Sequence, residues 1–268
     1  MMTGAAREIA RNPVKEKLAR GEVVASMALR VVPGVEIVRI AKSAGFDMLY
    51  VDLEHSAFSL QATSQISIMG LEAGVPVFVR VPAYTPEYVS RVLDGGALGV
   101  IAPGVRSAAE ARQVVDAVKY PPAGSRGLGP GLPLLQYRTF PPEQALPAMN
   151  DATMVVVQFE SAGALEAMEE IVAVPGVDMI LIGTNDMLAD MGLPGQYDHP
   201  KVEDAYRRTI ACCRKHGKHV GVGGFGSRPD LVEKYVKMGG RMVSTGTDLA
   251  FLIAECGKRV KQVRDIKL

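Results

Sequence analysis

The residues best suited to chemistry gather in the segment VDLEH, which carries Asp52, Glu54 and His55. Side chains alternate along a strand, so Asp52 and Glu54 share one face and His55 lies just past the strand end. An imidazole beside carboxylates is suited to act as a general base near neutral pH. The alternative is a histidine that only satisfies a carboxylate in a polar layer.

A second pair of carboxylates, Glu160 and Asp186, follows two consecutive apolar runs. Oxygen ligands with no histidine or cysteine nearby favour a hard divalent cation that keeps waters or takes substrate oxygens. Spacing alone leaves another interpretation open, because Asp186 could instead be the N-cap of a helix over residues 187–191.

Arg80 lies inside the apolar run VFVRVP. A guanidinium in such a strand needs an anionic partner or a carbonyl group. We expect an oxyanion of the substrate, and the alternative is a salt bridge to Asp52 or Asp94.

Two glycine-containing segments are candidates for binding anions through backbone N–H groups. GVGGFG, residues 221–226, lacks the lysine of a phosphate-binding loop and is better explained as a backbone turn. The N–H groups from Gly183 to Asp186 open toward a helix start and are better placed to cradle a carboxylate.

These residues must be positioned by elements whose pattern repeats along the chain. Eight short β-branched runs occur, at residues 23–29, 48–53, 77–81, 99–101, 154–158, 179–182, 219–222 and 242–244. Amphipathic helical stretches are predicted at 33–44, 60–73, 86–94, 108–118, 162–173, 201–216 and 228–238.

Strands that alternate with helices imply a parallel sheet covered by helices, and eight such units match a (β/α)8 TIM barrel forming one domain over residues 1–268. An open, doubly wound sheet is the competitor, but no glycine-rich phosphate loop follows the first strand. In a TIM barrel the reactive groups come from the carboxyl ends of the strands, where the candidates above lie. The irregular Gly/Pro-rich stretch 120–135 is predicted to be a functional loop.

Composition excludes several classes of protein. The 268 residues carry 30 basic and 29 acidic side chains, a net charge of +1, which argues against nucleic acid as a partner. No apolar run approaches the length of a membrane helix, and the charged amino-terminal segment does not resemble a secretion signal, so we expect a cytoplasmic chain. The three cysteines are too few and too badly spaced for a disulfide framework or a zinc site.

Six ordered motifs resemble those of the HpcH/HpaI aldolase family of metal-dependent class II pyruvate aldolases. They are VDLEH (51–55), VRVP (79–82), LDGGALGVIAPGV (93–105), YPPAGSRGLG (120–129), VQFES (157–161) and GVDMILIGTNDM (176–187). The resemblance covers nearly the whole chain. It implies a (β/α)8 barrel whose last helix packs on a neighbouring subunit, in a homohexamer built from two trimers.

The same resemblance implies roles for single residues. Glu160 and Asp186 would hold Mg²⁺, Mn²⁺ or Co²⁺, and a 2-keto acid would chelate that metal. Gln158 and the backbone around Gly183, Thr184 and Asn185 would bind the substrate. The other assignments are His55 as the catalytic base, Arg80 beside the keto oxygen, Asp94 as a residue that orients His55, if needed from a neighbouring subunit, and Asp52 and Glu54 as holders of metal-bound waters.

The resemblance also implies the reaction, a reversible cleavage of 4-hydroxy-2-keto acids into pyruvate and an aldehyde through a metal-bound pyruvate enolate. The chain departs from the family pattern at IGTNDM, where Thr184 and Asn185 replace Pro and Ala or Ser, so the donor acid is open. The segments MALRVV (27–32) and STGTDLAFL (244–252) are similar to the macrophomate synthase branch of the family. One alternative is therefore an oxaloacetate decarboxylase or a C–C bond-forming enzyme that uses the same enolate. A catalytically idle barrel that binds keto acids is the third hypothesis.

Overall fold

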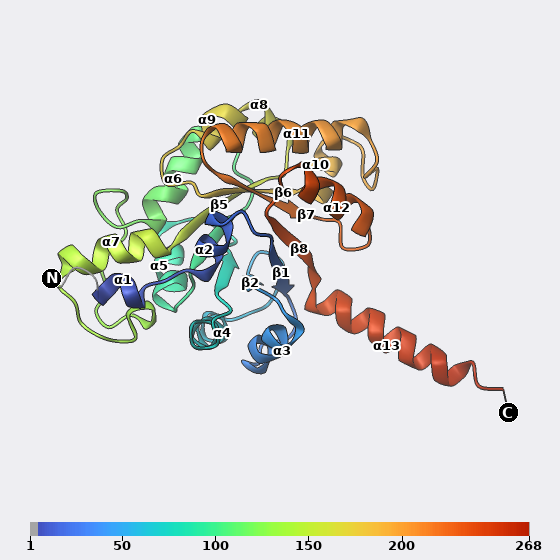
Figure 1. Ribbon diagram of the computed structural model, residues 1–268, viewed down its shortest axis with the longest axis horizontal. Coiled ribbons are helices and arrows are strands. Elements are labelled where there is room, and N and C mark those ends of the chain that lie inside the picture. The colour runs from blue at the N-terminus through green and yellow to red at the C-terminus, as the bar shows by residue number, and fades with distance from the viewer. Residues whose placement is uncertain (1–4, 268) are drawn as a thin grey trace.

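The computed structural model describes residues 5–267, and the chain forms a closed barrel of eight parallel strands in sequence order, with β8 paired to β1 (Figure 1). The strands are β1 (Val24–Leu29), β2 (Met48–Asp52), β3 (Val77–Arg80), β4 (Gly99–Ala102), β5 (Met154–Phe159), β6 (Met179–Gly183), β7 (His219–Gly223) and β8 (Met242–Thr247). All eight predicted runs are strands. The predicted (β/α)8 barrel is confirmed, and the open doubly wound sheet is wrong.

Helices follow every strand and cover the outside of the barrel. They are α1 (Ala5–Ile9), α2 (Pro13–Ala19), α3 (Glu36–Ala44), α4 (Leu60–Ala73), α5 (Pro86–Asp94), α6 (Ala108–Val118), α7 (Pro142–Ala152), α8 (Ala162–Glu166), α9 (Met168–Val172), α10 (Thr184–Asp190), α11 (Pro200–Lys215), α12 (Pro229–Met238) and α13 (Asp248–Arg264), with a short 3-10 helix η1 (Pro133–Leu135). The helix predicted at 33–44 begins only at Glu36.

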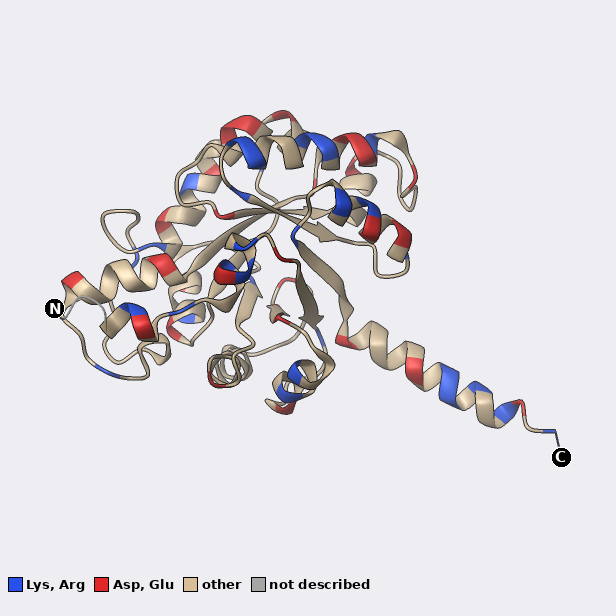
Figure 2. Ribbon diagram, in the orientation of Figure 1, with Lys and Arg blue, Asp and Glu red and all other residues tan. Residues whose placement is uncertain are grey.

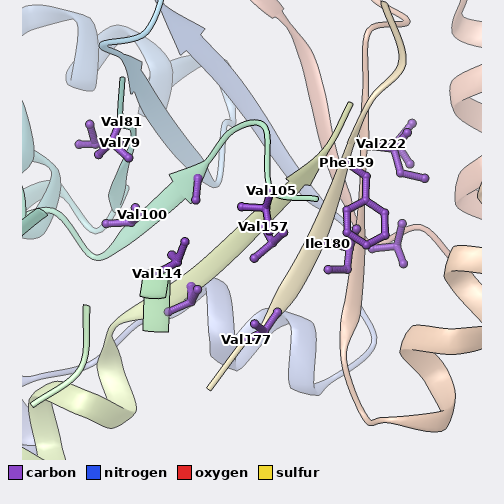
Figure 3. Packing of buried hydrophobic residues seen from close by; sticks show 14 of the residues in the cluster. Val79, Val81, Val100, Val105, Val114, Val157, Phe159, Val177, Ile180 and Val222 are labelled. Atoms are coloured by element: carbon purple, nitrogen blue, oxygen red, sulfur yellow. The ribbon is translucent and has the colours of Figure 1, made fainter. Parts of the chain in front are cut away.

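The apolar core has two layers because strand side chains alternate between the barrel interior and the helices. Outward-facing residues such as Val79, Val157 and Ile180 pack against the helix ring (Figure 3). The inward-facing set, which includes Phe78 and Leu181, fills the barrel centre. The barrel is therefore a packed core with no channel through it.

The inward-facing rows become polar at the carboxyl ends of the strands. In β2 the row Met48, Tyr50 ends in Asp52, and in β3 Phe78 is followed two residues later by Arg80. Gln158 ends the corresponding row of β5. A period of two thus places the polar candidates above the apolar centre, at the barrel mouth.

The irregular stretch 120–135 lies at the opposite end of the barrel. Its residues Leu132, Leu134 and Leu135 pack with Val14 and Leu18 from α2, which precedes β1. Pro133 and Leu134 also line a hollow beside the residues that lead into β3 and β4. Within one protomer this stretch is remote from the mouth, so a role in substrate selection would require a second copy of the chain.

The last helix, α13, extends away from the barrel as a free arm (Figure 1). Of its 17 residues only Asp248 is buried, while Leu252, Ile253, Val260 and Val263 are exposed. Its basic residues gather toward the free end (Figure 2). Among residues 5–267, no helix is both long and apolar enough to cross a membrane.

Candidate active site

A cavity of about 260 Å³ opens at the barrel mouth. Its walls come from the ends of β1, β2, β3, β5, β6, β7 and β8 and the segments that follow them. The lining residues are Arg30, Tyr50, Arg80, Gln158, Leu181, Gly183, Thr184, Asn185, Asp186, Gly223, Gly224, Gly226, Ser244, Gly246, Thr247 and Ala250. Six of the eleven site residues predicted from the sequence line this cavity, and the other five, Asp52, Glu54, His55, Asp94 and Glu160, are not among its lining residues.

A fully buried carboxylate, Asp52, organises one wall of this cavity. The strand register places Asp52 directly beside Arg80, whose Nε and Nη2 donate to Oδ1 and Oδ2 at 2.9 and 2.7 Å. The Nε of Arg30 donates to Oδ2 at 2.7 Å. Burial raises the pKa of Asp52, but the hydrogen bonds and charge of Arg80 and the charge of Arg30 outweigh it, so the pKa lies below its ordinary value. The salt bridge left open as an alternative for Arg80 is present, with Asp52 as its partner.

Glu160 lies just past β5, where burial raises its pKa to about 7, helped by the charges of Glu54 and Asp186 and opposed by a hydrogen bond from the Gly104 N–H. The Nε2 of Gln158 donates to Oε1 of Glu160 at 2.5 Å. A Cβ at Gly183 would lie 2.8 Å from that Nε2 and 3.0 Å from Cγ of Glu160. Glycine at 183 is thus what lets Glu160 approach the start of α10.

Asp186 lies in the first turn of α10, which begins at Thr184, three residues earlier than the capping alternative requires. No side chain caps this helix, so the interpretation of Asp186 as an N-cap is wrong. The Thr184 hydroxyl donates to the Gly223 carbonyl at 2.7 Å and lies 3.0 Å from the Tyr206 hydroxyl. Because that hydroxyl is engaged, Thr184 offers a ligand its backbone.

His55 and Glu54 lie in the bend after β2. The His55 side chain is 53% exposed, and its Nε2 is 3.7 Å from Oε2 of Glu54. The backbone N–H of His55 donates to Oδ1 of Asp52 at 3.2 Å. Oε2 of Glu54 is buried without a hydrogen-bond partner among residues 5–267, although Nη1 of Arg80 is 3.2 Å away. The imidazole is therefore accessible to a ligand while its backbone is fixed.

Asp94 does not join this group within one protomer. It ends α5, which runs back from the mouth toward the amino ends of the strands, and its Oδ1 accepts from Nη2 of Arg126 at 2.6 Å. Over the described part of the chain, no hydrogen bond or ion pair links Asp94 to His55. Only a second subunit could bring the two together.

The segment GVGGFG is the end of β7 and the turn that follows it, and its residues Gly223, Gly224 and Gly226 line the cavity. Gly224 has a φ of +89°, and a Cβ there would lie 3.1 Å from Cβ of Thr184. The structure therefore explains these glycines by the turn and by the close approach of α10.

Sequence reasoning places Arg30 at the end of the first predicted strand without giving it a role, and it did not identify Tyr50. Arg30 follows β1 directly, and Tyr50 faces inward from β2 with its hydroxyl 2.9 Å from Oγ of Ser244. Their position next to a strand's carboxyl end was the available signal. The engagement of Arg30 by Asp52 required the tertiary structure.

A separate group of side chains that could bind a metal lies on the outer surface, where Glu169 of α9 meets Cys212 of α11 and His216 directly after that helix. Hydrogen bonds from Lys215 and His216 lower the pKa of Glu169 to about 2, and burial raises the pKa of Cys212 to about 11. The three side chains thus already satisfy one another. Cys213 is buried and Cys256 is exposed, and all three cysteines are free.

The donor set at the mouth fits a hard divalent cation. Glu160 is held close to the turn that carries Asp186, and the two carboxylates repel each other. Oε1 of Gln158 is buried there without a hydrogen-bond partner among residues 5–267. Like-charged carboxylates and an unsatisfied amide oxygen are the surroundings that a hydrated cation satisfies.

Comparison with known proteins gives the family. Residues 7–254 match the family model described as HpcH/HpaI aldolase/citrate lyase. A 4-hydroxy-4-methyl-2-oxoglutarate aldolase from Hapsidospora irregularis is 38% identical over 224 residues, 83% of each chain.

Solved structures agree with the barrel. The crystal structure of an HpcH/HpaI aldolase from Desulfitobacterium hafniense superposes with a TM-score of 0.89 at 32% identity, covering 94% of this chain and 97% of that one. Macrophomate synthase, at 23% identity and a TM-score of 0.78 over 96% and 88% of the two chains, shares the fold. The chain belongs to the HpcH/HpaI aldolase/citrate lyase family and is a carbon–carbon lyase of the aldolase type.

Proposed function

We propose that this chain cleaves 4-hydroxy-2-keto acids reversibly into pyruvate and an aldehyde, with a divalent cation held by Glu160 and Asp186. The observation that carries the proposal is the grouping, at the barrel mouth, of the Glu160 carboxylate with its raised pKa, unsatisfied oxygens of Glu54 and Gln158, and the buried guanidinium of Arg80. The relative in Hapsidospora irregularis, by its name, acts on a substrate of this class.

A cation held by Glu160 and Asp186 would polarise the keto group and stabilise negative charge on its oxygen. Glu54 and Gln158 have unsatisfied oxygens that accept hydrogen bonds from water. Such contacts would orient the cation's water ligands. Asp52 instead accepts hydrogen bonds from two arginines. In this proposal Asp52 therefore holds the two guanidiniums in place, and Glu54 is the residue that binds the water ligands of the cation.

Arg80 supplies a permanent positive charge beside the reacting keto oxygen, and Asp52 keeps it in place. His55 takes the proton from the C4 hydroxyl as the C3–C4 bond breaks. The bonding electrons pass to C3 and form the enolate of pyruvate, and the released fragment leaves with a C4 carbonyl. The proton that His55 has taken then returns through water to C3, which completes pyruvate and leaves the imidazole neutral again.

The substrate carboxylate would lie at the start of α10, against the backbone of Gly183, Thr184 and Asn185. No side chain caps this helix, and the first N–H groups of a helix have no partner within it. Asn185 has its Oδ1 engaged by the Tyr197 hydroxyl at 2.7 Å, which fixes this turn.

We further infer that the working enzyme is a homo-oligomer, a hexamer of two trimers, in which α13 packs on a neighbouring copy. The exposed apolar residues of α13 recur at positions 249, 252, 253, 260 and 263, the spacing of one helix face. The placement of Asp94 far from His55 within one protomer supports the same arrangement, since Asp94 could then orient His55 of another subunit.

The test of the proposed function is metal-dependent release of pyruvate from a 4-hydroxy-2-keto acid, together with exchange of pyruvate methyl protons in D₂O followed by NMR. Glu160→Gln and Asp186→Asn should each lower turnover by about a hundredfold or more, because several kcal/mol of charge stabilisation are lost. Glu143→Gln, on the exposed surface of α7, is the control. Full activity in both site variants, or activity indifferent to a chelator, would contradict the proposal.

Decarboxylation of oxaloacetate would generate the same pyruvate enolate. Comparing kcat/KM for the two substrates distinguishes this reaction from aldol cleavage. The kcat/KM for oxaloacetate should be lower than that for the 4-hydroxy-2-keto acid. The reverse order would make decarboxylation the principal reaction of this site.

A further inference from the structure

Arg30 presents an open guanidinium face to the cavity. Its Nε donates to Asp52, but no hydrogen bond joins its Nη1 or Nη2 to any residue in the described range 5–267. The side chain is 35% exposed and lines the cavity. Two N–H donors on one edge of a guanidinium match the two oxygens of a carboxylate.

Arg80 differs from Arg30 in this respect. Its Nε and Nη2 both donate to Asp52, its Nη1 lies 3.2 Å from Glu54, and its side chain is only 8% exposed. All three of its nitrogens thus face protein carboxylates. Of the two guanidiniums at this wall, Arg30 is the one whose two terminal nitrogens have no hydrogen-bond partner among residues 5–267.

Both ends of Arg30 are held in place before any ligand arrives. Asp248, the first residue of α13, accepts the backbone N–H groups of Arg30, Val31 and Val32 at 2.8 to 3.0 Å. Asp52 fixes the side chain through Nε. A receptor that is ordered in advance loses little entropy on binding, so its contacts contribute fully to affinity.

The position of Arg30 also says which part of a substrate it would meet. In a closed barrel of eight strands, the end of β1 lies across the mouth from the end of β5, where Gln158 and Glu160 are. The guanidiniums of Arg30 and Arg80 donate to the same Oδ2 of Asp52, so a ligand whose keto oxygen lies beside Arg80 extends its next carbons toward Arg30. The wall between β6 and β1 includes the polar Ser244 and Thr247.

We propose that Arg30 binds a second carboxylate of the substrate, attached at C4, so that the preferred substrates are 4-hydroxy-2-keto diacids and the released fragment is itself an oxo acid. This inference rests on the proposed function. The reaction is otherwise unchanged: the C4 hydroxyl proton goes to the base, the C3–C4 bond breaks, and C4 becomes a carbonyl that still carries its carboxylate.

The experiment compares kcat/KM for two substrates that differ at one group, 4-hydroxy-2-oxoglutarate with a carboxylate on C4 and 4-hydroxy-2-oxovalerate with a methyl there. The wild type should prefer the diacid. Arg30→Gln should lower kcat/KM for the diacid about 10- to 100-fold more than for the methyl substrate, mainly through KM, because a charge-assisted contact is lost. Arg30→Lys should recover part of the preference.

Arg39→Gln is the matched control, since Arg39 lies on α3 of the same βα unit, exposed and outside the cavity. It should keep the wild-type preference. An Arg30→Gln variant that is folded by circular dichroism but loses both substrates equally would overturn the inference, as would a wild type that prefers the methyl substrate. A wild type that cleaves neither substrate and exchanges no pyruvate protons would instead overturn the proposed function.

Discussion

At the scale of single residues, the site is organised by one buried carboxylate. Asp52 accepts hydrogen bonds from two arginines and from the backbone N–H of His55, so three groups of the mouth depend on it. A buried ion pair gains its stability only when every partner is present, because an unpaired buried charge is very unfavourable. The polar mouth is therefore a single electrostatic unit.

Asp52→Asn should lower the free energy of unfolding at pH 7 by about 3 kcal/mol, because Arg80 stays buried without its counter-charge. The carboxyl pKa is depressed in the folded state, so its stabilisation is present above the unfolded pKa and is lost as pH falls through the folded pKa. The variant lacks that part of the acid sensitivity. Urea unfolding at pH 7 and at about pH 3 measures both effects.

Asp151→Asn is the control for this prediction, since Asp151 pairs with Arg7 on the exposed surface. Such pairs contribute less than about 1 kcal/mol. Equal losses of unfolding free energy in Asp52→Asn and Asp151→Asn would contradict the prediction that the buried pair contributes more than the exposed one.

At the scale of elements, the loop after β1 is tied to the first turn of α13. The Asp248 carboxylate accepts four backbone N–H groups, three from residues 30–32 and one from Leu249. These bonds align the end of β1 with the end of β8, the two strands that close the barrel. The arm-like helix and the wall of the cavity thus share one anchor.

Asp248→Asn should loosen this loop, because an amide keeps one acceptor oxygen where the carboxylate has two. We expect faster hydrogen–deuterium exchange at residues 30–32 and a loss of about 1–3 kcal/mol of stability. Asp265→Asn, at the other end of α13, is the control. Unchanged exchange at residues 30–32 in Asp248→Asn would show that the loop is held by other contacts.

At the scale of the whole molecule, one protomer leaves two features incomplete. The apolar face of α13 has no partner among residues 5–267, and Asp94 lies at the end of the barrel opposite His55. Association of copies would cover the apolar face of α13, and it could bring Asp94 of one subunit close to His55 of another. Assembly and activity are therefore expected to be linked.

Leu252→Glu combined with Ile253→Glu should shift the protein to smaller species in light scattering coupled to size exclusion, because two charges would have to be buried at the interface. Turnover should fall with the loss of assembly. Lys258→Glu, an exposed charge change on the same helix, is the control. A double variant that keeps both its mass and its turnover would contradict the link.

Local patterns in the sequence predict much of this architecture. The period-two runs determined the eight strands, and the same period put Asp52, Arg80 and Gln158 on the inward row at the mouth. The sequence also identified His55, Glu160 and Asp186 as candidates, because polar residues at strand carboxyl ends converge in any such barrel.

Only the tertiary structure decided how those groups are paired. Register between strands set Asp52 beside Arg80, and closure of β8 on β1 brought Asp248 to the loop that carries Arg30. The direction of α5, which runs back from the mouth, separated Asp94 from His55. Side-chain pairing depends on contacts between residues far apart in the chain, which periodicity does not encode, so which guanidinium stays open to a ligand was decided by the fold.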